Sequence, residues 1–280
     1  MYAIEKDVFY GHDSNEKQVA DIYHPKSGKN FPVVLFIHGG GWKVGSKEMF
    51  QEYGPYFAKN GFFAVSIDYR LSTPENPTWP KVKDDVNQAL TWIVEDAPLK
   101  WNIDVDNICV IGESCGAQLA VLLSLEHRFK DRIKAIIGVY GVYNVEGWWH
   151  HTHRTREDDP VGDFIGGSPE ELPNEYDNSS PSDRLKKVLP ESFKKIPFFL
   201  LWGDEDDVVP PIQSYKFAQQ LLTLGNEVET FVLPESGHYW FSVLPWLDGG
   251  RLTDYPNDIA APKLLSYLEE KLLKQNIVDS

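Results

Sequence analysis

Short apolar runs separated by stretches of helical pattern are the feature of this sequence that most constrains its fold. The strongest strand candidates are Pro32–His38, Phe62–Tyr69, Asn107–Gly112, Ile133–Tyr140, Pro197–Trp202 and Val228–Leu233. Helical patterns follow at Lys47–Asn60, Lys81–Asp96, Ser114–Arg128, Pro211–Leu224 and Ala261–Lys274. Strands that alternate with helices form parallel sheets, because each return to the same end of the sheet needs a crossover. The sequence therefore predicts an α/β fold with a mostly parallel sheet flanked by helices.

Two N-terminal segments, Glu5–Tyr10 and Gln18–Tyr23, alternate apolar and polar residues with a period of two. This period is typical of half-buried strands. We expect the two segments to form an antiparallel pair at the sheet edge, which gives a sheet of eight strands. The length of 280 residues fits a single domain over residues 1–280.

Residues 142–196 interrupt the alternation of strands and helices. This segment is irregular in pattern and rich in aromatic residues, His and Pro. A long irregular connection is unusual inside a compact domain and often forms a lid or a binding insertion. We interpret the segment as a small cap over the active site and not as a separate domain.

The charge balance limits the class of partner. Lys and Arg total 27 against 42 Asp and Glu, a net charge of −15, which repels nucleic acids and anionic membranes. The first ten residues lack the apolar core of a signal peptide, and no run approaches the about 18 apolar residues of a membrane span. Cys109 and Cys115 lie in and just after an apolar strand, so we expect buried free thiols. These features predict a cytoplasmic protein and leave its oligomeric state open.

The run Gly112-Glu113-Ser114-Cys115-Gly116 fits the G-x-S-x-G pattern between a predicted strand and a predicted helix. Glycines at both ends allow a sharp strand-to-helix turn that exposes the serine at the carboxyl edge of the sheet. Ser114 is therefore the candidate nucleophile. The N–H of Cys115, at the start of the helix, is a candidate donor to an oxyanion.

The run His38-Gly39-Gly40-Gly41-Trp42 follows another predicted strand. Three successive glycines are costly to order, and close approach of the backbone to a carbonyl oxygen would explain them. The N–H groups of Gly40 and Gly41 are thus expected to complete the oxyanion hole. His38 could be a base, but we favour a structural role in which it holds the loop through a hydrogen bond.

Two further motifs supply an acid and a base. A run of four acids, 204–207, follows the strand that ends at Trp202, and His238 follows the last predicted strand after a flexible Gly. One of the acids is expected to orient the His, while most of the others lie at the surface. The order Ser, Asp, His along the chain is the order of the α/β-hydrolase fold.

These motifs, HGGGW at 38–42, DYRLS at 68–72, GESCG at 112–116, GDEDDVVP at 203–210 and SGH at 236–238, resemble those of small esterases of the α/β-hydrolase superfamily. The nearest groups are the hormone-sensitive-lipase-like carboxylesterases and the BD-FAE acyl esterases. The resemblance implies a triad of Ser114, Asp206 and His238, with Asp206 chosen by its spacing to the Pro of the acid motif and Asp207 as the alternative.

The sequence departs from the lipase-like pattern in two places. The elbow reads Glu-Ser-Cys where those groups usually carry Asp-Ser-Ala, and only 37 residues precede HGGGW, so we expect no N-terminal helical cap of their kind. A cap would have to come from residues 142–196, which puts the acyl preference in doubt.

Aromatic residues are the candidates for substrate contact. We expect Trp148 and Trp149 of the insertion, with Trp42 and Trp240 from the other side, to wall the substrate pocket or to pack the lid. His150, His151 and His153 invite a metal hypothesis, but no acid or Cys lies nearby at a familiar ligand spacing, and the triad needs no metal or other cofactor.

The combined interpretation is a serine carboxylesterase that acts on small-molecule esters with short acyl chains. Aryl esters such as hydroxycinnamoyl esters are the alternative if the tryptophans form an open platform. An amidase, an arylformamidase or a peptidase would use the same residues. A non-catalytic ligand receptor of this fold is disfavoured, because such receptors lack the His found here at 238.

Overall fold

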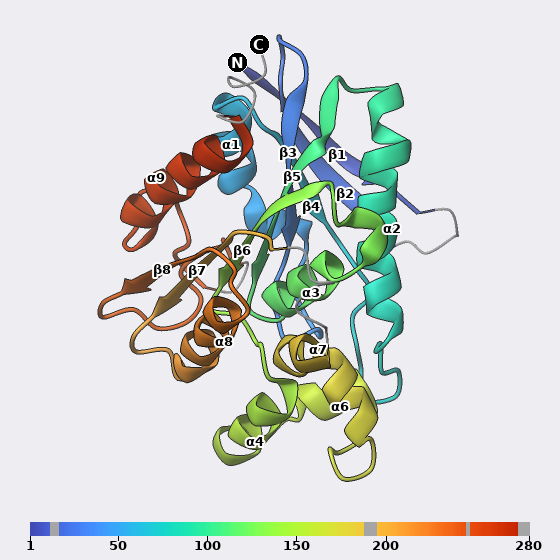
Figure 1. Ribbon diagram of the computed structural model, residues 1–280, viewed down its shortest axis with the longest axis vertical. Helices are drawn as coiled ribbons and strands as arrows, with labels where there is room; N and C mark the ends of the chain where they lie inside the picture. The colour runs from blue at the N-terminus through green and yellow to red at the C-terminus, as the bar shows by residue number, and fades with distance from the viewer. Residues whose placement is uncertain (12–16, 188–194, 245–246, 274–280) are drawn as a thin grey trace.

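A computed structural model describes residues 1–11, 17–187, 195–244 and 247–273. Its centre is an eight-stranded sheet with the order β1-β2-β4-β3-β5-β6-β7-β8 (Figure 1). The strands are β1 Tyr2–Phe9, β2 Val19–Pro25, β3 Phe31–Ile37, β4 Phe63–Ile67, β5 Ile103–Glu113, β6 Ile133–Val139, β7 Phe198–Gly203 and β8 Val228–Leu233. β1 and β2 pair antiparallel at one edge, and β3 to β8 are parallel. The predicted mostly parallel sheet with an antiparallel edge pair is confirmed.

Helices cover both faces of this sheet. They are α1 Tyr53–Lys59, α2 Lys81–Glu95, α3 Cys115–Ser124, α4 Val145–Thr155, α5 Pro160–Ile165, α6 Pro173–Ser179, α7 Pro181–Lys187, α8 Ile212–Thr223 and α9 Asn257–Leu268. α1 and α9 lie on one side of the sheet, and α2 and α3 lie on the other (Figure 1). In the part of the chain that the structure describes, no helix has the length and apolar character needed to cross a membrane.

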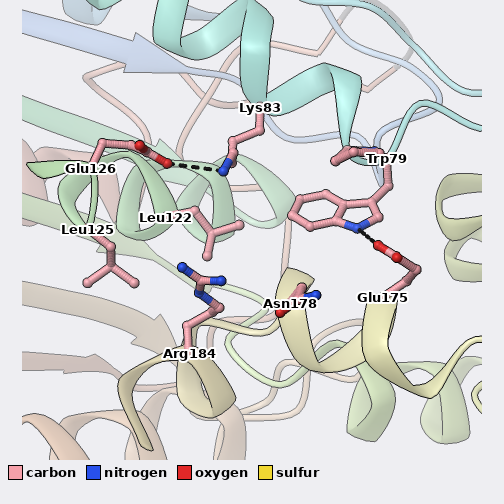
Figure 2. A pocket seen from close by; sticks show the side chains of 9 residues that line it. Trp79, Lys83, Leu122, Leu125, Glu126, Glu175, Asn178 and Arg184 are labelled. Carbon is pink, nitrogen blue, oxygen red and sulfur yellow. Dashed lines mark hydrogen bonds and ion pairs between the residues drawn. The ribbon is translucent and has the colours of Figure 1, made fainter. Parts of the chain in front are cut away.

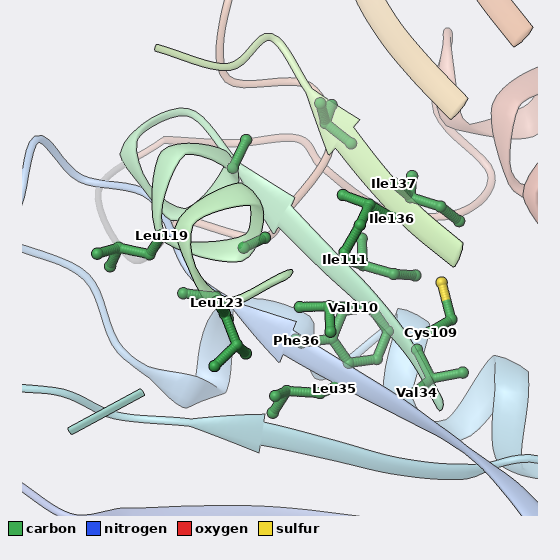
Figure 3. Packing of buried hydrophobic residues seen from close by; sticks show 14 of the residues in the cluster. Val34, Leu35, Phe36, Cys109, Val110, Ile111, Leu119, Leu123, Ile136 and Ile137 are labelled. Carbon is green, nitrogen blue, oxygen red and sulfur yellow. The ribbon is translucent and has the colours of Figure 1, made fainter. Parts of the chain in front are cut away.

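The core lies where the central strands meet α3. Side chains of β3, β5 and β6, among them Leu35, Val110 and Ile136, pack together with Leu119 and Leu123 of α3 (Figure 3). Each of these side chains is buried. Parallel strands covered on both faces read as continuous apolar runs, which is why the pattern of the sequence located them.

Both cysteines are buried and form no disulfide, as expected. Cys109 lies within β5, among the central strands of the core (Figure 3). Cys115 is the first residue of α3.

Three predicted helices differ from those observed. The helix predicted over Ser114–Arg128 is α3, which ends at Ser124. The stretch predicted as one helix from Lys47 to Asn60 is a short 3-10 turn followed by α1. Pro55 lacks a backbone N–H and fits only the first turn of a helix, so α1 begins just before it, at Tyr53. α9 begins at Asn257, four residues before the predicted start, and the predicted end at Lys274 lies outside the described residues.

Residues 142–187 contain the four short helices α4 to α7, joined by loops, which corrects the description of this segment as irregular. Residues 188–194 lie outside the described residues. α4 is capped by Asn144, whose side chain accepts a hydrogen bond from the N–H of Gly147. α5 is capped by Asp159, which accepts from the N–H of Gly162 at 2.8 Å, and it begins at Pro160. Short helices with good caps show no long apolar period, so the pattern did not reveal them. α4, α6 and α7 lie together at one end of the molecule (Figure 1).

Candidate active site

Ser114 lies at the turn between β5 and α3. Its φ of +53° is a strained conformation for a residue with a side chain. Close packing imposes this turn: a Cβ added at Gly116 would lie 2.2 Å from the carbonyl oxygen of Ile37 in β3. The backbone N–H of Ser114 donates to the Val139 carbonyl of β6 at 2.9 Å. The turn is therefore fixed by both neighbouring strands and holds Ser114 at the carboxyl edge of the sheet.

His238 connects Ser114 to Asp206. Ser114 Oγ lies 3.1 Å from His238 Nε2, and His238 Nδ1 lies 2.7 Å from Asp206 Oδ2. The other oxygen of Asp206 accepts the backbone N–H groups of Val208 and Val209 at 3.0 and 2.8 Å. A carboxylate held this way keeps one oxygen free to accept the Nδ1–H of the imidazole, which leaves Nε2 as an acceptor toward Ser114.

The structure brings Asp206 to the histidine and leaves the adjacent acids elsewhere. Asp206 is buried, whereas Asp204, Glu205 and Asp207 are exposed. The prediction that most of the four acids lie at the surface is confirmed. The turn after β7 allows only one of them to point inward.

The glycine-rich loop lies beside Ser114. A Cβ added at Gly39 would be 3.1 Å from Ser114 Cβ, so the loop passes at van der Waals distance. Gly40 has a φ of +105°, and a Cβ there would lie 2.1 Å from the Val44 carbonyl oxygen. Gly40 and Gly41 both line the pocket that contains Ser114. The loop thus lies beside Ser114, and the role of the Gly40 and Gly41 N–H groups as oxyanion donors stays a prediction.

His38 contacts the backbone of this glycine-rich loop. His38 Nδ1 lies 2.7 Å from the Gly39 carbonyl oxygen, and its ring stacks on Tyr69 at 4.2 Å. Burial lowers the pKa of His38 to about 4, so the ring is neutral. Its hydrogen bond is the structural contact that the sequence analysis favoured, and none of its bonds reaches Ser114.

Cys115 contacts the glycine-rich loop through its side chain. The N–H of Trp42 donates to Cys115 Sγ at 3.2 Å. Burial raises the pKa of the thiol to about 11, so it remains protonated near neutral pH. The thiol of Cys115, which stands where the lipase-like groups usually carry Ala, thus joins the glycine-rich loop to the start of α3.

Glu113 is a functional candidate that the sequence analysis missed. Its Oε1 accepts hydrogen bonds from Ser242 Oγ at 2.7 Å and from the Gly39 N–H at 3.3 Å, and its Oε2 accepts from Tyr140 Oη at 2.9 Å. Burial raises the pKa of this carboxyl, and these hydrogen bonds oppose that effect. Because the ring of Tyr140 also packs on His238 at 4.2 Å, Glu113 links the glycine-rich loop to the loop that carries the histidine.

Replacing Glu113 by Gln should lower kcat about tenfold with a smaller change in KM, and should lower the unfolding temperature. The Gln amide could keep two of the three hydrogen bonds, but its NH2 would face the Tyr140 hydroxyl. That hydroxyl already accepts the N–H of Phe241 at 3.3 Å, so its proton would lose its acceptor. Steady-state kinetics and thermal unfolding measure both effects. Glu229→Gln, an exposed glutamate of β8, is the control, and unchanged kinetics and stability in Glu113→Gln would contradict the linking role.

A pocket of about 240 Å³ opens beside Ser114 and His238. Its lining comes from the glycine-rich loop, the insertion and the loops after β7 and β8: Gly40, Gly41, Lys43, Val44, Ser114, Trp148, Arg156, Asp158, Pro160, Val208, His238 and Tyr239. Residues of the insertion thus form one wall. The charged groups of that wall were not predicted, because nothing in the pattern of the segment indicates that the end of α4 folds back toward Ser114.

Those charged groups are paired with one another. Arg156 donates from Nε and Nη2 to the two oxygens of Asp158 at 2.8 and 3.2 Å, which lowers the pKa of Asp158. Lys43 Nζ lies 2.5 Å from Asp163 Oδ2 and 3.7 Å from Asp158. Two cations face two carboxylates, so the mouth of the pocket has no net charge.

Of the four tryptophans predicted to contact substrate, only Trp148 lines this pocket. Its Nε1 donates to the Val208 carbonyl at 2.8 Å, which holds α4 against the loop after Asp206. Trp42 is fully buried and stacks on Phe164 of α5 at 3.9 Å, so it packs the insertion onto the sheet domain.

The other two tryptophans also serve packing. Trp149 is half-buried, and its ring lies 3.8 Å from that of His153. Trp240 is buried with its ring edge-on to Tyr140 at 5.4 Å. Trp42, Trp149 and Trp240 therefore do not line this pocket, and their observed contacts are those of packing, the alternative that the sequence left open. Sequence alone could not distinguish lining from packing, because the direction of each ring depends on tertiary contacts.

The three histidines of α4 have separate partners. His151 Nε2 donates to the Asp207 carbonyl at 2.8 Å, His150 lies 3.6 Å from Glu146, and His153 lies 3.5 Å from Asp159. Within the described ranges, no group of three or more His, Cys, Asp or Glu side chains is arranged to hold a metal ion.

Comparisons with known proteins place this chain in a family. The BD-FAE family model matches residues 20–221. The probable isoprenylcysteine alpha-carbonyl methylesterase ICME of Oryza sativa subsp. japonica is 28% identical over 259 residues, which cover 88% of this chain and 60% of that protein. Esterase LipC of Mycobacterium tuberculosis is 28% identical over 271 residues, with coverage of 89% and 62%. The chain thus spans about three fifths of the length of these curated relatives.

Solved structures support the fold. Esterase B from Lactobacillus Rhamnosis superposes with a TM-score of 0.79 at 18% identity, covering 99% of this chain and 88% of that one. The bacterial heroin esterase gives a TM-score of 0.75 at 21% identity, with coverage of 97% and 84%. The fold is the α/β-hydrolase fold, as predicted. With a family model that matches well over half of its residues, this chain belongs to the BD-FAE family.

Proposed function

We propose that this protein is a serine carboxylesterase that hydrolyses small neutral esters with short acyl groups. The observation that carries the proposal is the chain of contacts Ser114–His238–Asp206, at 3.1 and 2.7 Å, which opens onto a pocket bounded by Gly40 and Gly41. The names of the sequence relatives, methylesterase and esterase, support an ester as the substrate class.

In the proposed mechanism, Ser114 Oγ attacks the ester carbonyl while His238 Nε2 takes its proton. The N–H groups of Gly40, Gly41 and Cys115 stabilise the oxyanion of the tetrahedral intermediate. The imidazolium, paired with Asp206, then protonates the departing alcohol and leaves an acyl-enzyme. Water attacks this acyl group with His238 again as the base, which releases the acid and restores Ser114.

The pocket favours a small, neutral substrate. Its volume of about 240 Å³ lies below the range of roughly 300–1,000 Å³ that is usual for drug-sized ligands. The balanced charges of Lys43, Arg156, Asp158 and Asp163 give no net attraction for an ion. Among the described residues of the insertion, Trp148 alone brings an aromatic ring to the wall, and Tyr239 adds one from the loop after β8, which weakens the case for a broad aromatic platform.

We expect kcat/KM for p-nitrophenyl acetate or butyrate to exceed that for the octanoate by about tenfold or more. Each added methylene contributes about 0.8 kcal/mol only where apolar wall receives it, and the small pocket has little such wall. The measurement is kcat/KM across acetyl, butyryl, octanoyl and feruloyl esters, with a formanilide as the amide. A maximum at octanoyl would contradict short-acyl specificity, a feruloyl maximum would favour aryl esters, and preferred cleavage of the formanilide would favour an amidase.

Two adjacent tryptophans offer a matched pair of variants for the same assay. Trp148→Leu should raise the ratio of octanoyl to acetyl activity, because it removes bulk from the pocket wall. Trp149→Leu should leave this ratio unchanged, because Trp149 packs on His153 outside the lining. Equal ratios in the two variants would show that Trp148 does not limit acyl length.

A further inference from the structure

A second cavity lies between α2, α3, α6 and α7 (Figure 2). Its volume is about 230 Å³, and it shares no lining residue with the pocket at Ser114. Its walls include the ring of Trp79, the side chains of Leu122 and Leu125, and the polar groups of Asn178 and Arg184. Five of its nine lining residues are polar or charged and four are apolar, so the cavity suits a ligand that has both an apolar body and a polar group.

Most of the charged and polar groups around this cavity already have partners. Lys83 Nζ lies 3.0 Å from Glu126 Oε1, and Trp79 Nε1 donates to Glu175 Oε2 at 2.8 Å. The hydrogen bond to Glu175 uses only the Nε1–H at the edge of the Trp79 indole. The rest of the ring is apolar surface in the cavity (Figure 2).

Arg184 differs from these groups. Its half-buried side chain extends from α7 toward Leu122 and Leu125 (Figure 2), and among the described residues no carboxylate pairs with it. Acids and bases next to it on α6 and α7 pair with each other instead: Lys186 with Asp183, and Lys187 with Asp177. A guanidinium presents several N–H donors in one plane, which match the two oxygens of a carboxylate.

We propose that this cavity binds a small monocarboxylate with an apolar body about the size of a phenyl ring. The carboxylate accepts hydrogen bonds from Arg184, and the apolar body lies against Leu122, Leu125 and the Trp79 ring. A cavity of about 150 Å³ holds benzene, so the observed volume has room for a ring with a carboxylate. Lys83 offsets the charge of Glu126, whereas the guanidinium of Arg184 has no carboxylate partner among the described residues, so the single carboxylate binds there. The remaining charge of Glu175 disfavours a more highly charged anion.

This position connects the insertion to the helix that begins beside Ser114. Leu122 belongs to α3, whereas Asn178 and Arg184 belong to α6 and α7. These parts are already joined where Gln118 of α3 donates to the Ser179 carbonyl at 2.8 Å. A ligand that contacts both parts stabilises the folded chain by mass action, so it raises the unfolding temperature as its concentration rises.

Benzoate is the test ligand, titrated by calorimetry and by thermal unfolding into the full chain. We expect saturable binding in the millimolar range or tighter, as befits a ligand this small. Arg184→Gln should weaken binding by at least about tenfold, since it removes charge-assisted hydrogen bonds. Arg156→Gln is the matched control: that arginine lines the pocket at Ser114, so its loss should leave the affinity for benzoate unchanged. Neither readout depends on ester hydrolysis, so failure here is distinct from failure of the proposed function.

Two further arms test the ligand class. Benzyl alcohol, which lacks the charge, and acetate, which lacks the ring, should each bind at least about tenfold more weakly than benzoate. Leu125→Trp should block the cavity while it retains Arg184, and so abolish binding without loss of the guanidinium. The proposal is overturned by absence of benzoate binding, by full binding in Arg184→Gln or Leu125→Trp, by loss of binding in Arg156→Gln, or by equal affinity for benzyl alcohol.

Discussion

Ser114→Ala should reduce kcat for ester hydrolysis by at least about a thousandfold, because the proposed acyl-enzyme has no other nucleophile. The fold should remain. The side chain of Ser114 makes no capping hydrogen bond to α3, and the contact of Oγ is with His238. The turn depends on the close packing of Gly116 against β3, which the substitution leaves in place.

The measurement is kcat with p-nitrophenyl butyrate, together with thermal unfolding and labelling by a fluorophosphonate. Ser124→Ala is the matched control, since Ser124 is a buried serine of the same helix whose Oγ donates to the Val121 carbonyl at 2.7 Å. This variant should keep normal turnover and label fully. If purified Ser114→Ala retained turnover within tenfold of the parent, the assignment of the nucleophile would be wrong.

The central sheet and the three contacting residues could be predicted because local sequence determines them. Parallel strands are apolar where both of their faces are covered, so the buried parts of β3, β5, β6 and β7 were visible as apolar runs. The elbow at Ser114 needs glycine where α3 approaches β3, which leaves a motif that can be read without the structure. The candidate nucleophile, acid and base follow from their places directly after strands.

The composition of the pocket could not be predicted in the same way. Whether a tryptophan lines a pocket or packs a core depends on how the insertion folds, and Trp42 turned inward because its ring stacks on Phe164 of α5. Arg156 follows the last residue of α4 and lines the pocket at Ser114, because α4 ends beside that pocket. Glu113 did leave a signal in the sequence. A carboxylate next to Ser114, directly after the apolar run of residues 108–112, must have buried hydrogen-bond donors around it.

Asp206→Asn should lower kcat about ten-thousandfold, far more than the same change at the adjacent Asp207. In the parent, Oδ1 of Asp206 accepts two backbone N–H groups, from Val208 and Val209. An Asn must keep its carbonyl oxygen there, because an NH2 group would face two donors. Its NH2 then faces His238 Nδ1, which makes that nitrogen the acceptor and puts the ring proton on Nε2. In this tautomer His238 cannot take the proton of Ser114.

Asp207→Asn and Asp204→Asn are the controls for charge at this turn. Both side chains are exposed, so each variant should keep kcat within about threefold of the parent and leave stability nearly unchanged. The contact of Asp207 with α4 is through its backbone carbonyl, which accepts from His151 and survives the substitution. The three values of kcat, measured near neutral pH with one ester, therefore rank the acids directly. A ranking led by Asp207 would move the orienting carboxylate by one residue, and a loss below tenfold in Asp206→Asn would mean that the tautomer of His238 is held by another group.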